Sequence, residues 1–426
     1  MIKKRDFVNK CTFFMALLVG IYPIMPEYFA IGKIPVYYLI PILGVLLICI
    51  RTHSLQVSKQ FLRRNYIFIV CSVIPFLIHG QMGTLLNWFI TTLLILYLVN
   101  YYFHSKEQIE CALDIVLFTS IIINVFSLFE RLTEYNVWSV FETAPTIAND
   151  SSAYYRNGII RIESSFGVAL TFALYLLFIN IVALYKLSID DYKSSGFVLN
   201  KKRIGYIIAY ILSLVCMVFT QCRLPLITLI FVQACFALRG NTSKKIKGIV
   251  VSLCLLLVFA IVFGDVLVEK VSTYFSLIIG VFAGLSGKSA DDLTTAYRIE
   301  LIPALIPYIK NKPLLGYGAS YINKGFSFLI LDHQHTSIDN NYLAQAMYYG
   351  IVGLVGNVYW LFNIIKNSIK KRLKKVKIDY FEFSIGILCV AYMVNLFSVY
   401  QMAESHLFYL LVGLYCKYES IKKGTL

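Results

Sequence analysis

Long apolar runs recur throughout this chain, and they restrict its fold more than any other feature. Runs of roughly 16 to 24 residues are long enough to cross about 30 Å of hydrocarbon as α-helix. They recur near residues 11–31, 35–50, 65–80, 83–103, 109–129, 164–186, 204–220, 224–238, 248–264, 347–365, 380–399 and 404–418. We therefore predict an all-α polytopic membrane protein in which residues 1–426 form a single integral membrane domain with about twelve spans.

The composition excludes a soluble globular domain. Hydrophobic residues make up 58% of the chain, charged residues only 15%, and the mean hydropathy is +0.71. The opening segment MIKKRDFVNK leads into an apolar run without a small-residue cleavage site. We therefore expect the first span to remain in the mature protein.

The basic residues favour one side of the membrane. With the N-terminus in the cytoplasm, about 28 of the 39 Lys and Arg residues fall on the cytoplasmic side, although the outer segments are longer in total. This bias predicts that both termini are cytoplasmic. It also explains the net charge of +16 by proximity to anionic membrane lipids, so we expect no nucleic-acid partner.

Two predicted outer segments are long. The first extracytoplasmic loop covers residues 130–165, and the large extracytoplasmic loop, between spans 9 and 10, covers residues 265–346. Loops of that length are uncommon unless they are functional or folded. Within the larger one, VLVEKVSTYFSLIIGVFAGL and YRIELIPALIPYI are apolar enough to form amphipathic helices on the outer leaflet.

Two arginines are candidate site residues on the outer side. Arg223 stands between two apolar runs with almost no loop, in QCRLP, where it is either functional or an arginine that extends to the interface from a tight hairpin whose second helix opens with Pro225. Arg298 precedes KNKPLLGYG, where Pro and Gly indicate a turn and close backbone approach. Its alternative is a solvent-facing position on an amphipathic helix. Gly316 and Gly318 are too short a pattern for a phosphate-binding loop.

A polar cluster, LDHQHTSIDNN, directly precedes the predicted span at 347–365. Either His335 or Asp339 could accept a proton as a general base, while Asp339 or Asn340 could equally be a helix N-cap. His333 and His335 have no third ligand at metal spacing, nor do the adjacent carboxylates Asp291 and Asp292. We therefore expect no metal site and no cofactor.

Three features occur in order: QCRLP at an outer hairpin, YRIELIPALIPYIKNKPLLGYG in the large loop, and HTSIDNNYLAQAMYYGIVGL at the return into the membrane. Together they resemble the O-antigen ligase and polysaccharide polymerase superfamily. Cys222 stands where that family has a serine, and Leu224 where it has a small residue. Asp339 and Asn340 replace the His-Asn pair of ligases, which resembles the polymerase branch.

The resemblance implies a GT-C-like fold and a membrane glycosyltransferase without a metal. Its donor would be an undecaprenyl-diphosphate-linked oligosaccharide, its acceptor a hydroxyl of another lipid-linked repeat unit, and its product O-antigen or capsule at the outer face of the bacterial cytoplasmic (inner) membrane. The resemblance implies an inverting transfer in which His335 or Asp339 is the base. The expected contacts to diphosphate or sugar are Arg223, Arg298, Arg156, Arg161, Asn340 and Tyr342, with His79 and His406 as lesser catalytic candidates.

Other functions stay open from the sequence. A flippase for lipid-linked sugars would also have about twelve spans, but transporters bind substrate near the midplane. A ligase would move a finished polymer to a different acceptor, and a receptor or scaffold would do no chemistry. A chain-length regulator and a flippase are further candidate partners of a polymerase.

Overall fold

A computed structural model describes the chain over most of its helices. The described residues are 13–26, 28–32, 34–52, 57–142, 155–156, 159–193, 201–239, 293–319, 326–330, 333–335, 338–373, 379–398 and 405–424. The predicted span at 248–264 and the amphipathic segment VLVEKVSTYFSLIIGVFAGL lie outside them.

The described residues are mostly helical. The helices are η1 (Leu17–Ile21), η2 (Tyr22–Ile24), η3 (Val36–Tyr38), α2 (Leu39–Thr52), α3 (Lys59–Ile78), α4 (Met82–Trp88), η4 (Phe89–Leu93), α5 (Leu94–Tyr102), α6 (Lys106–Thr133), η5 (Val137–Phe141), η6 (Ser164–Phe166), α8 (Ala169–Lys193), α9 (Lys201–Phe219), α10 (Arg223–Arg239), α12 (Leu293–Asn311), α14 (Asn341–Leu373), α15 (Tyr380–Asn395) and α16 (His406–Lys422). The strands form three short antiparallel pairs, β1 (Ala30–Ile31) with β2 (Ile34–Pro35), β3 (Tyr155–Arg156) with β4 (Ile159–Ile160), and β5 (Phe328–Ile330) with β6 (His333–His335).

The chain is an all-α polytopic membrane protein, as predicted. Among the described residues, six helical stretches are long and apolar enough to cross a membrane, and shorter apolar helices cover 13–24, 36–52 and 380–395. They are 59–78, 82–102, 106–133, 169–189, 201–219 and 341–368. The total of twelve spans and the orientation of the termini stay predictions.

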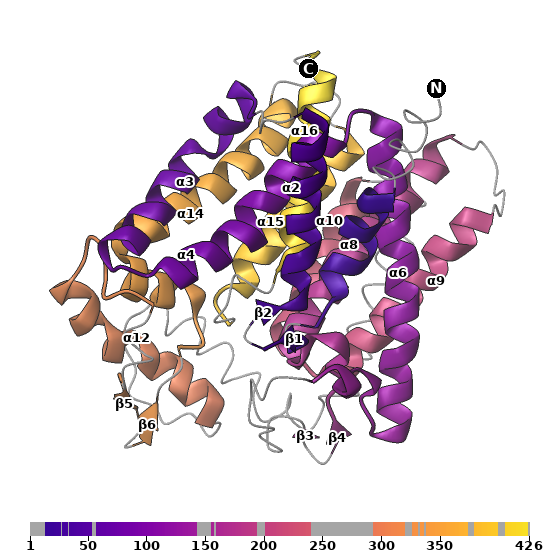
Figure 1. Ribbon diagram of the computed structural model, residues 1–426. Helices are drawn as coiled ribbons and strands as arrows, with labels where there is room; N and C mark the ends of the chain where they lie inside the picture. The colour runs from indigo at the N-terminus through magenta and orange to yellow at the C-terminus, as the bar shows by residue number, and fades with distance from the viewer. Residues whose placement is uncertain are drawn as a thin grey trace.

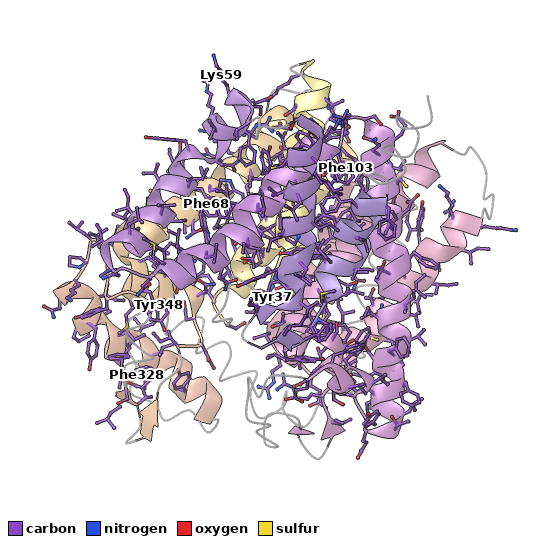
Figure 2. The ribbon with its side chains drawn as sticks, viewed as in Figure 1. Tyr37, Lys59, Phe68, Phe103, Phe328 and Tyr348 are labelled. Carbon is purple, nitrogen blue, oxygen red and sulfur yellow. The ribbon has the colours of Figure 1, made fainter. Side chains whose placement is uncertain are left out.

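The helices run between two ends of the bundle (Figure 1). One end, here called the basic end, holds Lys59, the C-terminal turn of α16 with Lys422, and Lys106, whose Nζ donates to Tyr418 of α16 at 3.4 Å. Lys59 and the C-terminal turn of α16 lie at the top of the view in Figures 1 and 2. The opposite end, here called the loop end, holds α12, the three strand pairs and the α9–α10 turn.

Polar caps begin several helices at the basic end. The Ser58 side chain accepts a hydrogen bond from Phe61 N at 3.1 Å at the start of α3. Ser105 and Gln108 form a capping box at the start of α6. Because each cap satisfies N–H groups that the helix itself leaves unpaired, the sequence fixes where these apolar helices begin.

Ion pairs tie helices together at the basic end. Lys186, only 5% exposed, contacts Glu110 and Asp114 of α6 at 2.7 Å each. Arg64 of α3 pairs with Glu419 of α16 at 3.0 Å. These contacts join α8 to α6 and α3 to α16, so charge as well as apolar packing sets this end of the bundle.

The main core surrounds α8 and α16. Almost every residue of α16 from His406 to Ser420 is buried, and α8 is buried along most of its described length. Helices α6, α9, α10, α15 and α16 contact α8, while α5 and α15 contact α16. A second, smaller core at the loop end joins α12 and β5 to α14 through Leu301, Leu305, Phe328 and Met347.

Candidate functional site

The α9–α10 hairpin places Arg223 at the loop end. Its turn consists of Thr220, Gln221 and Cys222, and α10 begins at Arg223 with Pro225 in its first turn. The tight hairpin predicted from QCRLP is therefore confirmed. Gln221 has a φ of 53°, a left-handed conformation that costs a non-glycine residue roughly 1–3 kcal/mol.

The first turn of α10 suits an anion. It contains no acidic residue, and its first backbone N–H groups and the helix dipole favour negative charge. The half-buried Arg223 adds a guanidinium at the same place. A phosphate-like group would therefore be stabilised here.

Arg161 lies against the same turn. Its Nε donates to the Thr220 carbonyl at 3.1 Å and its Nη2 contacts Cys222 Sγ at 3.2 Å. The neighbouring Ile162 N donates to the Phe219 carbonyl at 3.4 Å, so this segment of the first outer loop lies along the end of α9. Arg161 and Arg223, both sequence candidates, thus flank Cys222.

A buried carboxylate supports this loop. Glu130, only 1% exposed, accepts hydrogen bonds from Glu163 N at 3.1 Å and Ser164 N at 2.9 Å. Burial, and then the charge of Glu130, raise the pKa of the Glu163 carboxyl to about 8, which Arg161 partly opposes. Ser164 has a φ of 54°, so left-handed non-glycine residues occur on both sides of the Arg161 contact.

A third arginine stands beside this turn. The Arg131 guanidinium lies 5.6 Å from the centroid of the Phe219 ring, within the range of a cation–π contact. Sequence reasoning did not select Arg131, Glu130 or Glu163. The available signal was the run of charged residues at the outer end of a predicted span, ER in LFERLTEYN.

The second part of the candidate site is the start of α14. Asn340 Oδ1 accepts from Leu343 N at 3.1 Å, so Asn340 is the N-cap that the sequence allowed as an alternative. Tyr342 donates its hydroxyl to the Met393 carbonyl at 2.7 Å, which fastens α14 to α15. Asp339, half-buried, directly precedes the cap.

The C-terminal turn of α15 contacts both parts. Asn395 Nδ2 donates to Thr228 Oγ1 of α10 at 3.2 Å. One residue later, the Leu396 carbonyl accepts from Asn341 N of α14 at 2.9 Å. The second turn of α10 and the start of α14 therefore contact the same turn of α15.

The remaining candidates are placed only by their backbone. Arg298 lies in α12, His335 in β6 and Arg156 in β3, and their side chains are outside the described part of the chain. Since α12 and α14 share the smaller core, Arg298 belongs to an element that packs on the helix carrying Asn340.

The two lesser histidine candidates, His79 and His406, contact other elements of the bundle. His79 Nε2 lies 2.9 Å from the Leu315 carbonyl. His406 is buried, with its ring centroid 4.7 Å from that of Tyr22 and 4.8 Å from that of Tyr37. Both side chains therefore contribute to packing between elements.

The PLLGYG segment docks on α14. Tyr317 N and Gly318 N donate to the Met347 and Tyr348 carbonyls, both at 2.8 Å. Gly350 has a φ of 66° and a ψ of −169°, so α14 is kinked there, and Ile351 N donates to Pro313 O at 2.8 Å. The close backbone approach predicted from the Pro and Gly residues of KNKPLLGYG is confirmed.

A known protein family matches the region of the chain that includes these elements. A family model described as O-antigen ligase matches residues 208–358, from within α9 to within α14. No curated protein matches the chain. Within the described residues, no three His, Cys, Asp or Glu side chains gather in a way that could hold a metal ion.

Proposed function

Since residues 208–358 place the chain in the superfamily of O-antigen ligases and polysaccharide polymerases, we propose that it polymerises undecaprenyl-diphosphate-linked repeat units. The reaction would take place at the outer face of the bacterial cytoplasmic membrane. The growing glycan, on its lipid diphosphate, would be the donor, and a hydroxyl of another lipid-linked repeat unit would be the acceptor.

The observation that carries the proposal is the meeting of Arg161 and Arg223 at the α9–α10 turn. Arg161 contacts Thr220 and Cys222, and Arg223 begins the helix directly after them. A guanidinium can donate two parallel hydrogen bonds to phosphate oxygens. Two such groups and a helix N-terminus would stabilise the charge that develops on a departing diphosphate.

The acceptor would bind nearer the start of α14. In the proposed step, the acceptor oxygen attacks the anomeric carbon as the bond from that carbon to the diphosphate oxygen breaks. The electron pair leaves with the diphosphate, and the hydroxyl proton passes to Asp339 or His335. A single in-line displacement inverts the anomeric configuration. Arg298 and Arg156 are further proposed contacts to the diphosphate or sugar.

Asp339 and Asn340 favour a polymerase over a ligase, because ligases of this superfamily have a His-Asn pair at this place. Asn340 caps α14, so it would hold Asp339 at a fixed helix start. A ligase would use the same cations for the same leaving group and would differ in its acceptor.

The test is the size ladder and lipid attachment of surface polysaccharide in cells with and without the gene. A polymerase predicts collapse of the ladder to one exported repeat unit. Polymer left on its carrier would instead indicate a ligase, and repeats trapped on the cytoplasmic face would indicate a flippase.

Complementation with Arg223→Ala or Arg298→Ala tests the two arginines individually. Each variant should fail to restore the ladder while the protein stays in the membrane, whereas Lys59→Ala, at the basic end, should restore it. A wild-type ladder from either arginine variant would remove that arginine from the mechanism.

A further inference from the structure

We propose that Glu130 is a positioning residue that holds Arg161 against the α9–α10 turn. Glu130 would thereby set the geometry of the cation pair, defined as Arg161 and Arg223. The inference rests on the proposed function, because it takes the ligand of the cation pair to be a polyprenyl diphosphate.

Both oxygens of the Glu130 carboxylate accept hydrogen bonds from one stretch of backbone. One oxygen accepts from Glu163 N and the other from Ser164 N, at 3.1 and 2.9 Å. A carboxylate is an acceptor at both oxygens, and hydrogen bonds to a charged acceptor are the stronger kind. Glu130 sits in the last turn of α6 and is 1% exposed, so this clamp is built on a helix and shielded from water.

The clamped residues are two and three positions from Arg161. Between them, Ile162 is buried and its N–H bonds the end of α9. The segment is thus held by α6 on one side and by α9 on the other, which leaves Arg161 directed at Thr220 and Cys222. On the far side of the clamp, Asn136 Nδ2 donates to the Ser164 carbonyl at 2.9 Å and braces the same turn.

This turn needs external support. Ser164 adopts a φ of 54°, which a residue with a Cβ keeps only where its surroundings over-determine it. Glutamine at position 130 would offer one acceptor and would direct an NH₂ group at a backbone donor. The segment would then relax, and Arg161 would move with it.

Neutralising Glu130 should change the affinity for an anion in opposite directions, depending on whether Glu130 acts through its charge or through the position of Arg161. A buried negative charge near the cation pair weakens anion binding through Coulomb repulsion, so neutralising it should tighten binding if charge were its only role. If Glu130 positions Arg161, neutralising it should weaken binding. The sign of the change therefore separates the two roles.

The experiment measures the affinity of the full-length protein, in detergent micelles, for undecaprenyl diphosphate. We expect Glu130→Gln and Arg161→Ala each to raise Kd by about tenfold or more. The double variant should bind no more weakly than Arg161→Ala alone, because Glu130 acts through Arg161. A loss of stability unrelated to Arg161 would instead add to the effect of Arg161→Ala.

The matched control is Glu134→Gln, which makes the same chemical change at an exposed position directly after α6. It should bind like the wild type or slightly more tightly. Asn136→Ala keeps the Glu130 charge and removes the second brace, so it should weaken binding in the same direction and carries the test if Glu130→Gln does not fold.

Two results would overturn the inference, and they differ. If Arg161→Ala weakens binding but Glu130→Gln and Asn136→Ala bind like the wild type or more tightly, the positioning role is wrong and the proposed function stands. If the wild-type protein does not bind undecaprenyl diphosphate, the proposed function fails and the inference fails with it.

Discussion

Replacing Gly316 by alanine tests whether the docking of PLLGYG on α14 holds the loop end together. Gly316 has a φ of +66°, and a Cβ placed there would collide with the Met347 carbonyl oxygen. Because that obstacle is backbone, it cannot rotate away. The two segments must separate, and the hydrogen bonds from Tyr317 N and Gly318 N, both 2.8 Å long, must lengthen.

The expected cost has two parts. The left-handed conformation costs an alanine roughly 1–2 kcal/mol. Weakening two hydrogen bonds adds about 0.5–1.5 kcal/mol each, so the total is roughly 2–5 kcal/mol. Gly32 is the matched control, since it has a φ of +63° and nothing within 4 Å of an added Cβ. Gly32→Ala should therefore cost only the conformational part.

The assay is the melting temperature of the purified protein in detergent micelles, with the surface polysaccharide ladder as a second measurement. Gly316→Ala should melt below Gly32→Ala by about 1 °C for each additional kcal/mol, because an unfolding entropy of about 2.1 cal/mol/K per residue is spread over 426 residues. It should also shorten the ladder, because α12 and the start of α14 lose their shared support. Equal melting temperatures for the two variants would refute the reasoning.

Three further predictions concern other parts of the molecule. The pKa of Glu163 in the folded protein, about 8, lies above the ordinary 4.5, so the contribution of its protonated carboxyl to stability is complete below pH 4.5 and is lost as the pH rises through 8. The melting temperature should therefore fall less between pH 5 and 9 in Glu163→Gln than in the wild type. Parallel profiles for the two proteins would contradict this. Lys186→Ala removes the buried partner of two partly exposed carboxylates that keep other hydrogen bonds, so it should cost about 1.5–3 kcal/mol. Lys202→Ala, whose side chain is 70% exposed, should cost at most about 1 kcal/mol, and similar melting temperatures would show that burial does not decide the strength of these pairs. Asn340→Ala should cost about 1 kcal/mol through loss of the cap while Asn340→Asp retains it, and equal unfolding midpoints for the two would mean that the cap is unimportant.

The positions of the helices could be predicted because each depends on a local pattern. Apolar length, and polar residues such as Ser105 at a helix start, lie within one stretch of chain. The hairpin at Arg223 was predictable for the same reason, since two apolar runs meet there with no room for a loop. A close backbone approach at Gly316 was also predictable, because paired glycines after a proline indicate it, although its partner, α14, was not.

Other parts of the candidate site depend on how distant segments fold together. Arg161 contacts Thr220, 59 positions away, and Glu130 bonds Ser164, 34 positions away. Nothing in either local sequence specifies its partner, so Arg161 could be proposed only as an additional cation, and Glu130 only as the boundary of a loop. The part played by α15 was also invisible, since Asn395 looks like an ordinary polar residue at a helix end.

The burial of α16 has a consequence for how this protein is made. Helix α16 is synthesised after every other described helix, yet it fills the interior between α5, α8 and α15. Until it inserts, the faces of α5, α8 and α15 that it covers have no packing partner, and Arg64 lacks the Glu419 carboxylate with which it pairs. The earlier helices must therefore enter the membrane before their central packing partner is made, so we expect substitutions that prevent insertion of α16 to expose the whole protein to membrane quality control.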